Sequence, residues 1–281
     1  MNVLNTNVLL INSKFYLRLL TGLLGATLLL VSIMSPWTYF VIFLVILILC
    51  LKEYYFILRD NGFRPFSFLG FTIGSYLFIL SFLVSAKLVP STYYISLLTI
   101  FPIVCIVFLY IKNLSNSLIN LSLSFAGIIY IAIPFSILNL ITFKSGSYSY
   151  NDLLLILIYT WVSESFAYIG GKKFGKKKLS HISPGKTWEG VFFGFLGNII
   201  VSLFLTYYFN NSFIFYLIFG LIVLIIGIFG DLFESLIKRG FSLKDSSNKL
   251  PGHGGYLDRF DSLLFIIPFI YFYLLFIKHF I

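Results

Sequence analysis

The sequence predicts an all-α polytopic membrane protein with about nine transmembrane helices, and three observations lead to this fold class. Hydrophobic residues make up 59% of the 281 positions and charged residues only 11%, whereas a soluble domain is roughly half apolar and a quarter charged. Apolar runs of spanning length recur along the whole chain. Lysine and arginine gather in alternate loops, which is typical of proteins threaded through a bilayer.

The expected spans follow from the rule that a helix needs about 20 mostly apolar residues to cross a bilayer. Nine segments meet it approximately: 17–35, 37–51, 66–86, 92–111, 119–142, 152–169, 190–209, 213–230 and 260–277. The turn Ser35-Pro36-Trp37 makes the first two a tight hairpin. Lys14 and Arg18 precede the first run without a small-residue cleavage site after it, so we expect this span to be retained.

The distribution of basic residues sets the expected orientation, because cytoplasmic loops carry an excess of Lys and Arg. With the N-terminus inside, nine alternating spans leave three basic residues outside, namely Lys87, Lys144 and Lys278. The other 17 lie inside: Lys14, Arg18, Lys52, Arg59, Arg64, Lys112, Lys172, Lys173, Lys176, Lys177, Lys178, Lys186, Lys238, Arg239, Lys244, Lys249 and Arg259. The C-terminus is then outside. The net charge of +10 is explained by the excess of Lys and Arg in the inner loops of a membrane protein, and we expect no nucleic-acid partner.

Acidic residues divide the chain into two regions. Seven of the ten lie at or near the inner ends of the last four spans: Glu164, Glu189, Asp231, Glu234, Asp245, Asp258 and Asp261. We therefore expect residues 1–150 to be a transmembrane scaffold. Residues 151–281 should form a catalytic region with cytoplasmic loops 170–189 and 231–259. Cys50 and Cys105 lie in apolar runs and form neither a disulfide framework nor a zinc motif.

The last inner loop combines oxygen ligands from two predicted helix ends. Asp258 and Asp261 are spaced i, i+3 where the last span begins. Four polar residues share one face after the preceding span: Asp231, Glu234, Ser235 and Lys238. Hard cations such as Mg²⁺ need only one or two carboxylates together with substrate phosphates. The spacing alone is equally compatible with interfacial salt bridges to Lys238, Arg239 and Arg259.

Two further inner-loop segments have features suited to phosphate. Pro251-Gly252-His253-Gly254-Gly255 is a turn whose glycines permit close backbone approach to a ligand. There His253 could donate to a phosphate or satisfy the loop backbone. The earlier loop has a lysine run over 172–178 and then the segment 183–190, which could begin a helix with free N–H groups for phosphate. Its partial P-loop spacings follow no strand, so a P-loop is excluded.

These segments resemble the phosphatidate cytidylyltransferase (CDP-diacylglycerol synthase) family. The family pattern G-D-x-x-E-S-x-x-K-R-x(4)-K-D, then P-G-H-G-G-x-x-D-R-x-D, is matched by Gly230, Asp231, Glu234, Ser235, Lys238, Arg239, Lys244, Asp245, Pro251, Gly252, His253, Gly254, Gly255, Asp258, Arg259 and Asp261. A second block, S-P-x-K-T-x-E-G, is matched by Ser183, Pro184, Lys186, Thr187, Glu189 and Gly190. The resemblance covers roughly residues 160–262. It departs at Glu164, where the family usually has Asp.

The resemblance implies a transferase of phospholipid biosynthesis that converts CTP and phosphatidate to CDP-diacylglycerol and diphosphate. It implies catalytic roles for Asp231, Asp258, Lys238, Arg239 and His253. It implies Mg²⁺, with room for a second cation, on Asp231, Asp258 and Asp261. It also implies that the substrates are bound by Ser183, Lys186, Thr187, Glu189, Ser235, Lys244, Asp245, Gly254, Gly255 and Arg259.

The expected location is the bacterial plasma membrane, with the active site facing the cytoplasm. We expect membrane lipids as further partners, and the chain could assemble as a homodimer. One alternative is a related CTP-dependent enzyme that acts on an ether lipid or an isoprenoid alcohol. A transporter is the alternative of a different class, but it predicts ionisable residues at mid-bilayer, and the first five spans show none there.

The charge distribution predicts the side on which the two long loops are exposed. A single cysteine placed in the 172–182 loop or in the 242–250 loop, in a background without Cys50 and Cys105, should react only with reagents that reach the cytoplasm. The measurement is thiol labelling of intact cells against inverted vesicles. Labelling of either position from outside intact cells would contradict the orientation.

Overall fold

The computed structural model describes residues 20–109, 117–209, 212–243, 246–247 and 254–280, and all regular elements in these ranges are helical. A helix over Leu20–Ser32 precedes the labelled elements. These are α2 (Pro36–Asp60), α3 (Ser67–Ser85), η1 (Ser91–Ile95), α4 (Ser96–Leu109), α5 (Ser117–Gly127), η2 (Ile128–Ala132), α6 (Ile133–Thr142), α7 (Asn151–Phe174), α8 (Trp188–Phe209), α9 (Phe213–Gly240) and α10 (Leu257–Phe280). The all-α prediction is therefore confirmed.

Seven helices of the described ranges are long and apolar enough to cross a membrane: Pro36–Asp60, Ser67–Ser85, Ser117–Thr142, Asn151–Phe174, Trp188–Phe209, Phe213–Gly240 and Leu257–Ile277. The apolar helices Leu20–Ser32 and Ser91–Val104, which fall on two other expected spans, are shorter. The count of nine stays a prediction. The hairpin expected at Ser35-Pro36-Trp37 is present, because one helix ends at Ser32 and Pro36 opens the next, where a missing N–H costs nothing.

The second expected span, 37–51, is longer in the structure than its apolar run. α2 continues to Asp60, so the acidic residue Glu53, expected in a loop, lies inside the helix and is fully buried (0% exposed). Hydropathy ends a span where polar residues begin, but the backbone hydrogen bonds of a helix continue as long as the side chains find partners.

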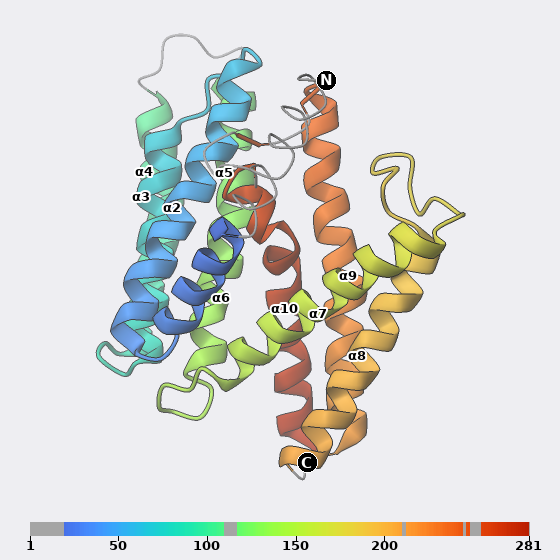
Figure 1. Cartoon of the computed structure of the whole chain (residues 1–281). Helices are drawn as coiled ribbons and strands as arrows, with labels where there is room; N and C mark the ends of the chain where they lie inside the picture. Colours follow the sequence, from blue (N-terminus) through green and yellow to red (C-terminus); the bar gives the residue numbers. More distant parts are fainter. Residues whose placement is uncertain (1–19, 110–116, 210–211, 244–245, 248–253, 281) are drawn as a thin grey trace.

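The helices form two groups that meet along α6 and α10 (Figure 1). α2, α3 and the continuous helix from α5 to α6 pack together, and α7 to α10 form the second group, with α7 crossing it obliquely. The segments after α3 and α6, which contain Lys87 and Lys144, lie at one end of the molecule. The α7–α8 loop, with its lysine run, lies at the other end. The segments with Lys87 and Lys144 therefore lie opposite the lysine-rich loop, and the orientation in the membrane stays a prediction.

Several buried polar side chains within the first group are hydrogen-bonded to one another or to backbone carbonyls, as an apolar environment favours. The Tyr39 hydroxyl donates to Asn139 Oδ1 at 2.8 Å, and Asn139 Nδ2 donates to Ser81 Oγ at 2.6 Å. The Tyr55 hydroxyl donates to the Ser124 carbonyl at 2.8 Å. These bonds join α2, α3, α5 and α6 to one another.

The contact between α9 and α10 depends on a glycine immediately before the first acidic residue of the motif. A Cβ at Gly230 would lie 2.7 Å from the Asp261 carbonyl oxygen and 2.9 Å from Ser262 Cα. Both are backbone atoms, which cannot rotate away. Only glycine therefore allows α9 to approach the first turns of α10 this closely, and the side chains on either side of the contact are brought together.

Gly230→Ala should destabilise the protein by about 1–3 kcal/mol through overpacking. Gly25→Ala, inside the helix Leu20–Ser32, is the matched control, because nothing lies within 4 Å of its Cβ position and both changes replace a glycine in a helix interior. Thermal unfolding in detergent measures the difference. Equal melting temperatures for the two variants would show that the contact is not close.

Candidate active site

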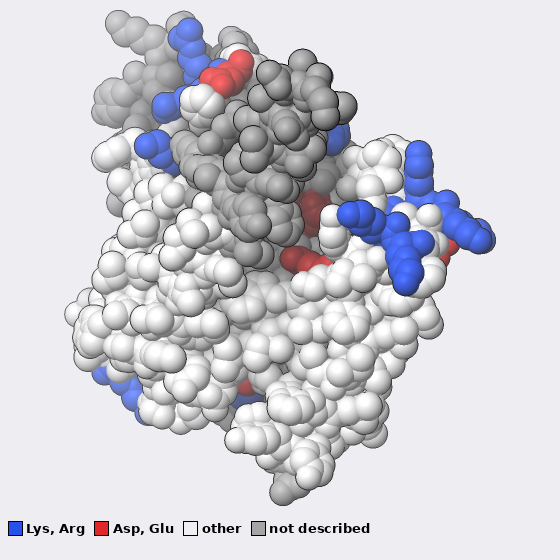
Figure 2. Space-filling model, in the orientation of Figure 1, with Lys and Arg blue, Asp and Glu red and all other residues white. Residues whose placement is uncertain are grey.

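A cavity of about 670 Å³ opens where the second group of helices meets the α7–α8 loop. Figure 2 shows acidic side chains within a hollow of the surface, beside a patch of lysine and arginine. Its charged lining residues come from α7, the loop, α9 and α10: Glu164, Lys172, Lys186, Asp231, Asp258, Arg259 and Asp261. Apolar residues of α8 and α9 form another part of the wall: Val191, Val223, Leu224 and Ile228. The cavity thus offers both charged and apolar surface.

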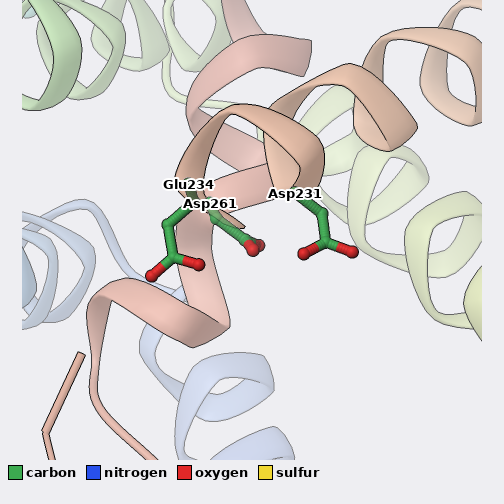
Figure 3. Close-up of side chains that lie close together, drawn as sticks. All are labelled: Asp231, Glu234 and Asp261. Atoms are coloured by element: carbon green, nitrogen blue, oxygen red, sulfur yellow. The ribbon is translucent and has the colours of Figure 1, made fainter. Parts of the chain in front are cut away.

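Three carboxylates gather at the point where α9 and α10 approach each other (Figure 3). One oxygen from each of Asp231, Glu234 and Asp261 lies within 4.8 Å of the others. Glu234 is 1% exposed and Asp261 is 7% exposed. Two ammonium groups offset part of this negative charge: Lys186 forms an ion pair with Asp231, and Lys238 forms one with Glu234. Among the described residues, no lysine or arginine forms an ion pair with Asp261, so carboxylates outnumber ion-paired ammonium groups in the cluster.

Asp258 organises the start of α10. Its Oδ2 accepts the backbone N–H groups of Gly255 at 2.7 Å and Ser246 at 3.0 Å, and the Ser246 hydroxyl at 2.9 Å. Its Oδ1 accepts a bond from Lys238 Nζ at 2.6 Å. The bond to Gly255 satisfies an N–H just before the helix, as a residue at the third position of a capping box does. The Asp258 carboxylate is therefore held on four protein donors.

The loop from α7 to α8 is a small hairpin. Leu179 N–H donates to the Lys186 carbonyl at 2.8 Å, and Trp188 N–H donates to the Lys177 carbonyl at 3.0 Å. Thr187 Oγ1 accepts the Gly190 N–H at 3.1 Å, which caps α8. The hairpin directs Lys186 towards Asp231, so the earlier loop and α9 share one site.

Glu189, in the first turn of α8, fixes the lysine-rich segment to this hairpin. Its carboxylate accepts the N–H groups of Lys176 at 3.0 Å and Lys177 at 3.2 Å. Negative charge is also favourable at a helix N-terminus. The lysines that follow α7 are thereby fixed to the start of α8, and none of them forms a salt bridge within the described residues.

A comparison with known families matches residues 16–277 to a model described as the cytidylyltransferase family. This match covers nearly the whole chain. The chain belongs to that family.

Relatives within the cytidylyltransferase family include a phosphatidate cytidylyltransferase from Thermotoga maritima. It is 46% identical over 128 residues, which are 43% of this chain and 47% of the relative. A phosphatidate cytidylyltransferase from Haemophilus influenzae is 41% identical over 129 residues, 43% of this chain and 45% of the relative. The chloroplastic phosphatidate cytidylyltransferase 4 of Arabidopsis thaliana is 45% identical over 105 residues, 37% of this chain and 27% of the relative. The matched segment thus spans less than half the length of these relatives.

The structure brings together six residues of the expected site as cavity lining: Lys186, Thr187, Asp231, Asp258, Arg259 and Asp261. Ser235 lies next to them, with its hydroxyl 3.4 Å from Asp231 Oδ1. Gly254 adopts a left-handed φ of 78°, which fits the expected turn. Lys244, Asp245 and His253 lie outside the described residues.

Other expected site residues have local contacts instead. Ser183 accepts the Lys186 N–H through its backbone at 3.1 Å. Arg239 is exposed and donates to the Leu243 carbonyl at 3.0 Å. Glu189 and Gly255 bond to backbone and side-chain groups of the two loops, and neither lines the cavity. These contacts support the shape of the site.

Three ionisable residues of the cavity and the acidic cluster were not among the site residues predicted from the sequence. Glu164 and Lys172 line the cavity from α7, and Glu234 completes the acidic cluster. Glu234 follows Asp231 at i+3, so its spacing could have indicated it. Glu164 was visible as the departure from the family pattern. Lys172 belongs to a lysine run that gave no means to separate a cavity residue from a topology anchor.

Proposed function

We propose that this protein is a phosphatidate cytidylyltransferase, which transfers the cytidylyl group of CTP to phosphatidate and releases diphosphate. The observation that carries the proposal is the cavity in which the two family motifs meet. It combines carboxylates, basic side chains and an apolar wall within one volume of about 670 Å³. One substrate is a polyanion and the other is a lipid with a phosphate head, so each needs a different part of such a lining.

The apolar wall supports a lipid as the second substrate. Val223, Leu224 and Ile228 lie on the face of α9 that leads from the membrane interior towards Asp231. A glycerolipid that stays in the bilayer can place its acyl chains along apolar helix surface and its phosphate at the helix end.

The basic lining residues would bind the phosphates. Lys186 and Arg259 face the cavity from opposite motifs, and Lys172 faces it from the end of α7. Arginine suits bidentate contact with phosphate oxygens, whereas lysine acts as a mobile point charge. The ion pair of Lys186 with Asp231 would hold this ammonium group ready beside the carboxylate cluster until a phosphate competes for it.

The reaction needs no proton abstraction. A phosphate oxygen of phosphatidate forms a bond to the α-phosphorus of CTP, and the bond between the α-phosphorus and the bridging oxygen to the β-phosphate breaks. The electron pair leaves with diphosphate. A phosphate monoester has a second pKa of about 6, so the attacking group is largely a dianion at neutral pH. The protein's part is to position the two substrates in line and to balance their charge.

The acidic cluster fits a hard divalent cation such as Mg²⁺. Asp231, Glu234 and Asp261 offer oxygens within 4.8 Å of one another, and carboxylate oxygens are the ligands that Mg²⁺ prefers. Oε1 of Glu234 is buried and accepts no hydrogen bond from the described residues. When bound, the cation would neutralise charge on the triphosphate. We assign it to these three residues and give Asp258 the positioning of the loop, because its oxygens already have protein donors.

The orientation completes the proposal. CTP is a cytoplasmic metabolite, so the cavity should face the cytoplasm, with the lysine-rich loop on that side of the plasma membrane. The alternating direction of the helices and the placement of Lys87 and Lys144 at the opposite end support this orientation. The N-terminus would then be cytoplasmic and the C-terminus outside, with nine spans in total.

Purified protein in detergent with Mg²⁺ and CTP should convert phosphatidate to CDP-diacylglycerol with release of one diphosphate per product. Parallel assays with an ether lipid phosphate and with polyprenol test the acceptor. Turnover of polyprenol without turnover of phosphatidate would reject the proposal, and so would the absence of CTP consumption with every acceptor by a folded preparation.

Asp231→Asn and Asp261→Asn should each lower kcat by about a hundredfold or more, because several kcal/mol of charge stabilisation are lost. The double variant should be little worse than either single one, since ligands of one ion act as a unit. Mn²⁺ binding followed by EPR gives a readout apart from turnover. Asp258→Asn should retain Mn²⁺ binding; loss of binding in this variant alone would return Asp258 to the ligand set in place of Asp261.

A further inference from the structure

An acidic residue of the first helix group reaches the loop that precedes α10. Glu53 lies in α2 and is 0% exposed. Its Oε2 accepts the Leu257 N–H at 2.9 Å and lies 3.1 Å from the Ser246 hydroxyl, while Oε1 accepts the Ser247 hydroxyl at 2.7 Å. These contacts join residues about two hundred positions apart. Glu53 does not line the cavity, so its contacts act on the loop.

The Leu257 N–H is the reason why this contact matters for the helix. Leu257 is the first residue of α10, and the first N–H groups of a helix have no partner within it. A carboxylate there satisfies one of them and interacts favourably with the positive end of the helix. A Cβ at Gly255 would collide with the Ser246 hydroxyl and the Glu53 carboxylate. The last glycine of the family motif is therefore matched in shape to Glu53.

A continuous set of polar contacts connects Glu53 to the acidic cluster. The Ser246 hydroxyl lies between the Glu53 and Asp258 carboxylates, at 3.1 and 2.9 Å. Asp258 accepts from Lys238 at 2.6 Å, and Lys238 forms the ion pair with Glu234. Each group is held by the next. A shift of Ser246 would alter the position of Asp258 and, through Lys238, of the cluster.

We propose that Glu53 is a positioning residue for the reaction: α2 holds the start of α10 through Glu53, and this contact sets the arrangement of Asp258, Lys238 and Glu234. The expected effect of Glu53 on kcat rests on the proposed function. That Glu53 holds the start of α10 rests on the geometry alone. It also gives the scaffold half of the chain a defined part in the active site.

Glu53→Ala should lower kcat by about tenfold, as expected when a set of buried hydrogen bonds loses its acceptor. The KM for CTP should stay within about twofold, because the side chain does not touch the cavity. Asp60→Ala is the matched control, since Asp60 is the other acidic residue of α2 and is exposed. Glu53→Gln should recover part of the lost activity, because its amide oxygen can still accept the Leu257 N–H.

Two measurements separate positioning from a loss of folding. Hydrogen exchange of the peptide that contains Gly255 and Leu257 should be faster in Glu53→Ala than in Asp60→Ala, with exchange in α8 unchanged. In a double-mutant cycle of kcat, Glu53→Ala and Ser246→Ala should be non-additive, whereas Asp60→Ala and Ser246→Ala should add. If Glu53→Ala cannot be purified, Glu53→Gln takes its place in the exchange comparison and in the cycle.

The outcomes distinguish this inference from the proposed function. Normal exchange in the Glu53 variant would overturn the inference whatever the activity. Faster exchange with unchanged kcat, or additive effects in the cycle with Ser246→Ala, would also overturn it. A wild-type protein that does not turn over phosphatidate would defeat the proposed function, and hydrogen exchange would still decide whether Glu53 holds the loop.

Discussion

The close approach of α9 and α10 at Gly230 is the constraint on which the candidate site depends. It brings Asp231 and Glu234 of one helix next to Asp261 of the other. Three carboxylates in so small a volume repel one another and lose hydration, which is unfavourable unless cations compensate. Lys186 and Lys238 provide part of this compensation from the protein itself. The remaining repulsion is the physical reason for the proposal that the cluster binds a divalent cation.

The α7–α8 loop and the α9–α10 loop, which contain the two family motifs, are stabilised by different contacts. The α7–α8 loop is a hairpin closed by its own backbone bonds, with Thr187 and Glu189 as local caps. The described part of the α9–α10 loop has few such bonds and is held by carboxylates of two helices, Asp258 and Glu53. A loop that depends on side chains from elsewhere can change its position when those contacts change. This difference agrees with the proposed reaction, in which the site would admit a nucleotide and release diphosphate.

The boundary between scaffold and catalytic region is less sharp than the distribution of charge suggests. α6 packs against α10, and α2 reaches the start of α10 through Glu53. The first helices therefore do more than occupy the bilayer, because they support the helix that carries Asp258 and Asp261. A membrane interior favours such bonds, since an unpaired polar group there has no water as an alternative.

The sequence by itself determined the helical class and most of the charged residues that line the cavity. Apolar run length and the spacing of motif residues are local properties, so they are readable without a fold. Only the tertiary structure decided which charged groups of different elements meet: Lys186 with Asp231, Lys238 with Asp258, and Glu53 with the start of α10. The extension of α2 beyond its apolar run to Asp60 could not be predicted either, because the described partners of Glu53 inside that helix lie about two hundred residues away along the chain. Such pairings depend on how helices cross, and helix crossing is set by small contacts such as Gly230 against the backbone of α10, which no pattern along the chain encodes.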